Sequence, residues 1–268
     1  MINMNIFVTG TNTDIGKTYV TKYLYKALRM RGYRVCIFKP FQTEEIGGGR
    51  YPDLEIYKNE CDLDYDVTSL YTFKDPVSPH LAFKIERHQQ LNHQTMIDKL
   101  ESLKAQFDMI LIEGAGGIAV PIYEYSDHFY MTTDLIKDTS DFIVSVLPSK
   151  LGAINDAIVH QKYIDHQELP PNVLIMNNYT DSAIEQDNLH TIEKLTHKSV
   201  YTLGHQATQE GFSEAFIQRM EAERRAEKVE RRRAVLREKP PLPHRRQRTQ
   251  APEPRHVSRR RREVHLSF

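Results

Sequence analysis

The stretch Gly10-Thr11-Asn12-Thr13-Asp14-Ile15-Gly16-Lys17-Thr18 decides the fold class of this chain. It follows an apolar run, Met4–Thr9, typical of a buried strand, and it leads into an amphipathic run, Lys17–Met30, typical of a helix. A strand, a tight loop and Gly-Lys-Thr opening a helix predict a phosphate-binding loop, because backbone N–H groups and the helix N-terminus then face the anion. We expect Lys17 to reach the β- and γ-phosphates and the Thr18 hydroxyl to bind Mg²⁺.

The spacing of this loop differs slightly from the common pattern, in which four residues separate the two glycines. Five residues separate Gly10 from Gly16, and Thr11 occupies the usual place of the first glycine. The alternative is a chance Gly-Lys-Thr at a helix start. The loop predicts a nucleoside triphosphate ligand and leaves the reaction open. Partition-type ATPases carry a second lysine where this chain has Asn12.

Outward from the loop, short β-rich runs alternate with amphipathic stretches. The remaining strand candidates are Val35–Phe38, Met109–Ile112, Phe142–Val146, Val173–Met176 and Val200–Leu203, and the remaining helix candidates are Thr95–Phe107, Ala153–Tyr163 and Ser182–Leu195. This alternation predicts an α/β fold, a mostly parallel, doubly wound sheet with helices on both faces, of the phosphate-loop nucleotide-binding type. Residues 41–52 are Gly-rich and polar, which predicts a loop.

Charged side chains stand at or near other strand ends, where such sheets place their ligands. Lys39 closes the second strand and is either a cation in the same crevice as Lys17 or an ordinary surface lysine. Glu113 ends the strand before Gly114-Ala115-Gly116-Gly117 and is either a metal-holding acid or a solvated turn residue. Asp53 is either a helix N-cap or a third Mg²⁺ ligand. Asn177 and Asn178 follow the fifth strand and either read a base edge or begin a turn.

The net charge of zero conceals two segments of opposite charge. Residues 221–268 hold 16 of the 36 basic residues and 7 of the 36 acidic ones, which leaves a body of charge −9 and a tail of charge +9. We expect a catalytic domain over residues 1–220 and an Arg-rich tail over residues 221–268, part helical and part disordered. Such a tail either binds nucleic acid without specificity or is foreign to the chemistry, and we favour the second interpretation.

Cysteine use and hydropathy predict a cytoplasmic protein. Cys36 and Cys61 are the only cysteines, too few for a disulfide framework, and no zinc-binding spacing is present. No apolar run is long enough to span a bilayer, and the N-terminus lacks the features of a signal peptide. We therefore expect no membrane association. Because the tail has no aromatic residue before Phe268 and no recognisable nucleic-acid-binding module, we also expect no specific nucleic-acid partner.

Taken together and in order, these motifs resemble dethiobiotin synthetase. The matching segments are GTNTDIGKT (10–18), FKP (38–40), PVSPHLA (76–82), EGAGG (113–117), LGAIND (151–156) and MNN (176–178), spread over about residues 4–218. The resemblance implies a reaction of 7,8-diaminononanoate, CO₂ or bicarbonate, and ATP. A substrate amine becomes a carbamate, the carbamate attacks the γ-phosphate to give a carbamic–phosphoric mixed anhydride, and the second amine closes the cyclic urea. The products are dethiobiotin, ADP and phosphate.

The resemblance also implies a role for each matching residue. Lys39 and Lys17 act in catalysis, and Thr18, Asp53 and Glu113 hold Mg²⁺. ATP contacts come from Thr13, Asp14, Ile15, Gly16, Lys17, Thr18, Tyr19, Asp53, Glu113, Gly114, Ala115, Gly116, Asn177 and Asn178. The substrate contacts Thr43 and, across a homodimer interface, Gly152, Ala153, Ile154 and Asn155.

One segment departs from the family pattern, and two other functions remain open. Residues 201–205 read Tyr-Thr-Leu-Gly-His where the family commonly has an Ile-Pro pair near the base. The alternatives are a non-catalytic nucleotide-sensing domain, against which Lys39, Asp53 and Glu113 argue, and a partition-type ATPase, against which Asn12 argues.

Overall fold

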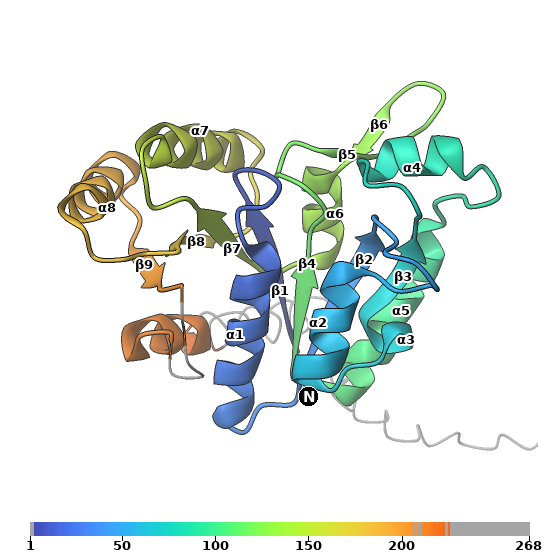
Figure 1. Cartoon of the computed structure of the whole chain (residues 1–268), viewed down its shortest axis with the longest axis horizontal. Helices are drawn as coiled ribbons and strands as arrows, with labels where there is room; N and C mark the ends of the chain where they lie inside the picture. The colour runs from blue at the N-terminus through green and yellow to red at the C-terminus, as the bar shows by residue number, and fades with distance from the viewer. Residues whose placement is uncertain (1–2, 206, 208–210, 223–224, 226–268) are drawn as a thin grey trace, which may run out of the picture.

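The computed structural model describes residues 3–205, 207, 211–222 and 225. Seven strands form one parallel sheet in the order β3-β2-β4-β1-β7-β8-β9 (Figure 1). These strands are β1 (Met4–Gly10), β2 (Val35–Gln42), β3 (Ser69–Thr72), β4 (Met109–Glu113), β7 (Phe142–Leu147), β8 (Asn172–Asn177) and β9 (Val200–Leu203). The predicted α/β class and parallel sheet are therefore confirmed.

Helices cover both faces of this sheet because the strands are apolar on both sides. In β4, Met109 and Leu111 pack into one apolar cluster, whereas Ile110 and Ile112 pack into the other. The first face carries α1 (Lys17–Met30) and α2 (Pro52–Cys61). The opposite face carries α5 (His93–Gln106), α6 (Thr132–Thr139), α7 (Ala153–His166) and α8 (Ala183–Thr196). Near-continuous apolar strands are typical of sheets buried in this way.

Smaller elements complete the described fold and were not predicted from the sequence. They are helices α3 (Tyr65–Thr68) and α4 (Pro79–Ile85) and the antiparallel pair β5 (Pro121–Glu124) and β6 (Phe129–Met131). Each has eight residues or fewer, too short for helical or alternating periodicity to become visible.

The loop predicted over residues 41–52 is wrong at both ends. Strand β2 continues through Gln42 because Phe41 and Gln42 pair with β3, and Phe41 is buried. Helix α2 already begins at Pro52, which is favoured in the first helical turn because its missing N–H group would have no partner there.

The end of the predicted domain packs on the sheet. Residues 214–222 are helical, and Phe216, Ile217 and Met220 are buried in the same apolar cluster as α1. Apart from Glu221, Ala222 and Arg225, the predicted tail 221–268 lies outside the described residues. Within the described part, none of the helices is long and apolar enough to cross a membrane.

Candidate functional site

A crevice of about 390 Å³ opens where β1, β2 and β4 end. Most of the predicted site residues line it: Thr13, Asp14, Gly16, Lys17, Thr18, Tyr19, Lys39, Thr43, Asp53, Glu113, Ala115 and Gly116. Because parallel strands end at the same edge of a sheet, residues 100 positions apart in the sequence meet here.

The phosphate loop leads from β1 into α1 through Gly16, whose φ of +93° lies in the left-handed region. A Cβ atom at this position would lie 2.1 Å from the Asn177 side chain, so only glycine fits. The Asn177 amide donates to the Ile15 carbonyl at 3.0 Å, which ties the loop to the end of β8. Asn177 thus holds the phosphate loop through this hydrogen bond. The Oδ1 atom of Asn177 has no hydrogen-bond partner among the described residues.

Lys17, the first residue of α1, is buried beside the crevice. Its Nζ atom donates to the Asn12 carbonyl at 3.1 Å, so the ammonium group lies against the loop backbone. Burial lowers the pKa of Lys17, and the carboxylate of Glu113 opposes this effect. The Lys17 ammonium group therefore lies at the boundary between the loop and the crevice.

Three side chains bring oxygen atoms to one point in the crevice. The Thr18 Oγ1 atom lies 2.9 Å from Asp53 Oδ1 and 2.9 Å from Glu113 Oε1. Asp53 is the second residue of α2, whose N-cap is Tyr51, so the N-cap interpretation of Asp53 is wrong. The solvated-turn interpretation of Glu113 is also wrong, because this side chain is fully buried.

Lys39 forms ion pairs with both carboxylates. Its Nζ atom donates to Glu113 Oε1 at 2.7 Å and also to Asp53 Oδ2. Lys39 is 5% exposed, which excludes the surface interpretation. Burial alone would lower the pKa of Lys39, but Glu113 and Asp53 outweigh it and raise this pKa. Burial would likewise raise the pKa of Asp53, yet Lys39 lowers it.

These residues fit a magnesium ion in their donor chemistry. One hydroxyl and two carboxylates supply hard oxygen atoms, which Mg²⁺ prefers, and the positive charge of Lys39 already lies between the carboxylates. Among the described residues, no group of three or more His, Cys, Asp and Glu side chains is placed to hold a metal ion by itself. Mg²⁺ usually takes few carboxylates and completes its shell with phosphates and water.

Sequence reasoning missed Tyr57, which contacts Glu113 from beneath the crevice. The Tyr57 hydroxyl donates to Glu113 Oε2, and both side chains are fully buried. Burial, and then the carboxylate of Glu113, raises the pKa of Tyr57 well above its ordinary value, so the phenol stays a donor. A tyrosine in a short helix gives no signal of this contact in the sequence.

Tyr19 and Asn178 both contact the segment that follows β9. The Tyr19 hydroxyl lies 2.9 Å from the Gly204 carbonyl and 2.7 Å from the His205 carbonyl, and it accepts from the Ala207 N–H. Asn178 has a φ of +56°, as expected for a turn, and its side chain contacts His205. The turn interpretation therefore describes Asn178, whereas Asn177 remains in the strand.

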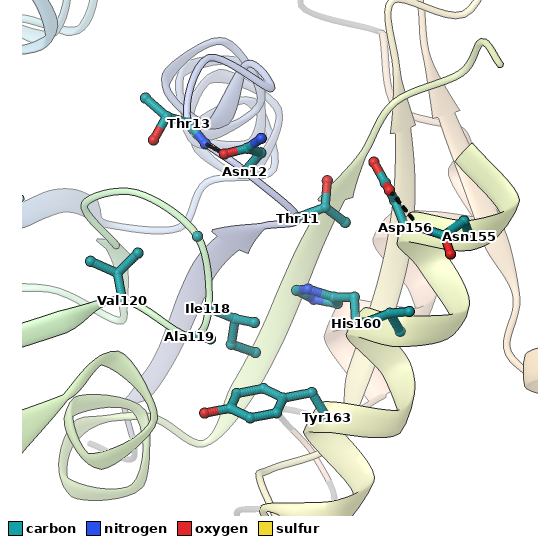
Figure 2. Close-up of a pocket in the computed structure, with 12 residues that line it drawn as sticks. Thr11, Asn12, Thr13, Ile118, Ala119, Val120, Asn155, Asp156, His160 and Tyr163 are labelled. Atoms are coloured by element: carbon teal, nitrogen blue, oxygen red, sulfur yellow. Dashed lines mark hydrogen bonds between the residues drawn. The ribbon is translucent and has the colours of Figure 1, made fainter. Parts of the chain in front are cut away.

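The predicted substrate segment at the start of α7 lies apart from the crevice. A second pocket of about 360 Å³ separates the phosphate loop from α7, and of this segment only Asn155 lines it (Figure 2). His160 and Tyr163 extend from α7 into the same space, facing Ile118. Ala153 is buried, and its N–H group donates to the Lys150 carbonyl. Within one chain, the segment 152–155 therefore does not meet Lys39 and Glu113 in one cavity.

The fold and the crevice together define a phosphate-loop, nucleoside-triphosphate-binding α/β protein. The chain is 98% identical over 217 residues to the ATP-dependent dethiobiotin synthetase BioD of Staphylococcus epidermidis, covering 81% of this chain and 97% of that protein. It belongs to the dethiobiotin synthetase family. The synthetase of Geobacillus sp. is 37% identical over 192 residues, which cover 71% of this chain and 80% of that protein.

Residues 4–205 also match the AAA domain family. Among solved structures, a ParA family ATPase from Chlorobium tepidum has a TM-score of 0.46 and 14% identity, over 76% of this chain and 84% of that one. A putative plasmid partition protein from Borrelia burgdorferi has a TM-score of 0.49 and 10% identity, over 77% of this chain and 88% of that one.

Proposed function

We propose that this chain is an ATP-dependent dethiobiotin synthetase. One amine of 7,8-diaminononanoate adds CO₂ and loses a proton, which gives a carbamate. A carbamate oxygen attacks the γ-phosphorus of ATP, and ADP leaves. The second amine then attacks the carbonyl carbon of the mixed anhydride, phosphate leaves, and a cyclic urea remains.

The observation that carries this proposal is the convergence of Lys17, Lys39, Asp53 and Glu113 in one crevice beside the phosphate loop. Two anions, the carbamate and the γ-phosphate, must meet there. Two like charges 4 Å apart repel by about 4 kcal/mol at an effective dielectric of about 20, so fixed cations are needed. The ammonium groups of Lys17 and Lys39 supply such charge at preorganised positions. Positioning and charge then suffice, and no covalent enzyme intermediate is required.

We assign the metal position to Thr18, Asp53 and Glu113, whose oxygen atoms converge within 2.9 Å of the threonine hydroxyl. Mg²⁺ bound there would neutralise charge on the phosphates. Lys39 would then be released from part of its contact with the carboxylates and would become available to the carbamate. Thr43, which lines the same crevice, offers its hydroxyl to the substrate.

We further infer that two chains form a homodimer in which α7 lies near the partner. Leu151, which precedes α7, is 98% exposed and Val159, in the middle of α7, is 60% exposed, so this region presents apolar surface to its surroundings. The segment Gly152–Asn155 does not line the crevice of its own chain. In a dimer, this segment would instead contact a substrate bound in the crevice of the partner chain. The N-terminus of α7 would favour a carboxylate there.

The test is phosphate release from ATP with and without the diamine, at fixed bicarbonate. We expect release that depends on the diamine in the unaltered protein and a loss of about 100-fold or more in Lys39→Ala, the scale typical of removing a group that stabilises transition-state charge. Lys26→Ala is the matched control because this lysine of α1 pairs with Glu60 of α2 and does not line the crevice. Release without any dependence on the diamine contradicts the proposal and favours a different ATPase activity.

A further inference from the structure

The two oxygen atoms of Glu113 have separate partners. Oε1 faces the crevice, where it accepts from Lys39 at 2.7 Å and lies 2.9 Å from the Thr18 hydroxyl. Oε2 faces away from the crevice and accepts from the Tyr57 hydroxyl. Since the carboxylate is fully buried, water cannot replace this donor without a change in packing. The phenol therefore determines which oxygen atom of Glu113 is left for the crevice.

Tyr57 comes from the same helix as Asp53. The two residues are four positions apart in α2, so their side chains lie on one face of the helix, one turn apart. Helix α2 thus supplies one carboxylate directly and holds the other through a hydrogen bond. A single element fixes both acids of the site relative to each other.

We propose that Tyr57 is a positioning residue for Mg²⁺-dependent nucleotide binding, acting through Glu113. The proposal rests on the metal position assigned above, and it names a residue outside the set implied by the family. Partners of metal-ligating side chains orient the ligand, and their loss typically costs 10- to 100-fold in metal affinity or activity. Tyr57 meets this description by its hydrogen bond to Glu113 and by its complete burial.

The competing role for Tyr57 is packing alone, because it belongs to the apolar cluster between α1, α2 and the sheet. Tyr25 provides the comparison. It lies in the same cluster, is nearly as buried, and its hydroxyl donates to the Cys61 carbonyl at the far end of α2 at 3.0 Å. Removing either hydroxyl deletes one buried hydrogen bond that involves α2, but of these two residues only Tyr57 contacts Glu113.

The experiment measures binding of a non-hydrolysable ATP analogue to the full chain by calorimetry, in EDTA and across a Mg²⁺ titration. In Tyr57→Phe we expect the Mg²⁺ concentration for half-maximal enhancement of binding to rise about tenfold or more. Binding in EDTA should stay within about twofold, and Tyr25→Phe should match the unaltered protein in both measurements. An unchanged Mg²⁺ midpoint in Tyr57→Phe, or an equal rise in Tyr25→Phe, overturns the role of Tyr57 and leaves the proposed function intact.

Tyr57→Phe leaves a buried carboxylate oxygen without a donor and can lower stability, so thermal unfolding accompanies each titration. If this variant does not fold, Tyr57→Phe is combined with Glu113→Gln and compared with Glu113→Gln alone. The same Mg²⁺ midpoint in both supports action through Glu113, whereas a further loss in the double variant overturns it. If Mg²⁺ does not enhance binding to the unaltered protein at all, the metal assignment and the role of Tyr57 both fail.

Discussion

Two lysines in one crevice have opposite electrostatic environments. Burial lowers the pKa of Lys17, whereas the carboxylates of Glu113 and Asp53 raise that of Lys39. Lys39 is therefore a cation at neutral pH, which suits its proposed role of offsetting the charge of a carbamate. For Lys17, the proposed partner is a triphosphate in the loop. We propose that the two lysines serve different purposes because their surroundings differ.

A buried histidine that lines the second pocket gives a prediction on pH at the residue scale. His160 on α7 has its Nε2 atom 2.9 Å from the Ser145 hydroxyl of β7, and burial lowers its pKa to about 4. In the unfolded chain this pKa is about 6.5. The neutral form therefore stabilises the fold fully above about pH 6.5, and this stability is lost as the pH falls toward about 4.

The gap between these two values corresponds to about 3 kcal/mol of unfolding free energy. His160→Gln keeps a polar group near Ser145 but does not titrate. We therefore expect the free energy of unfolding to fall by about 3 kcal/mol less between pH 6.5 and 4 in this variant than in the unaltered protein. Urea unfolding at several pH values measures it, with His190→Gln on the exposed face of α8 as control. Equal slopes in the unaltered protein and His160→Gln would contradict this account.

At the scale of elements, the site depends on where strands end. Strands β1, β2 and β4 are neighbours in the sheet, and each delivers one part of the crevice: the phosphate loop, Lys39 and Glu113. Asn177 at the end of β8 then holds the phosphate loop against the sheet. The loop geometry is thus fixed by an element distant in the sequence.

Gly16→Ala tests this contact between the loop and β8. The new Cβ atom would lie 2.1 Å from the Asn177 amide, so the loop or the amide must move, and we expect nucleotide affinity to fall about tenfold or more. Gly48→Ala is the control, because its φ of +65° brings similar backbone strain of about 1–2 kcal/mol while no atom lies near the added carbon. Fluorescent-nucleotide titration measures both, and an equal loss in the two variants would argue against the contact with Asn177.

Much of this arrangement could be predicted from the sequence, because its signals are local. The phosphate loop is one contiguous segment between a strand and a helix, and the six predicted strands are short runs rich in apolar residues. Tyr57 and the continuation of β2 through Gln42 could not be predicted, because both depend on partners distant in the chain. The choice between N-cap and site residue for Asp53 also required the residue at which α2 begins and the position of Lys39.

At the scale of the whole molecule, charge is divided between the two predicted segments. The body carries −9 and yet is proposed to bind ATP and a carboxylate substrate, so local cations such as Lys17 and Lys39 must act against the overall field. We propose that residues 1–220 suffice for the chemistry and that the basic residues 221–268 take no part in it.

The most direct test of the proposed function follows the carbon atom that closes the ring. The protein is supplied with ATP, 7,8-diaminononanoate and isotopically labelled bicarbonate, and the product is analysed by mass spectrometry alongside ADP. We predict one labelled carbonyl carbon in a cyclic urea for each ADP formed. ADP formation without a labelled cyclic product would contradict the proposed function.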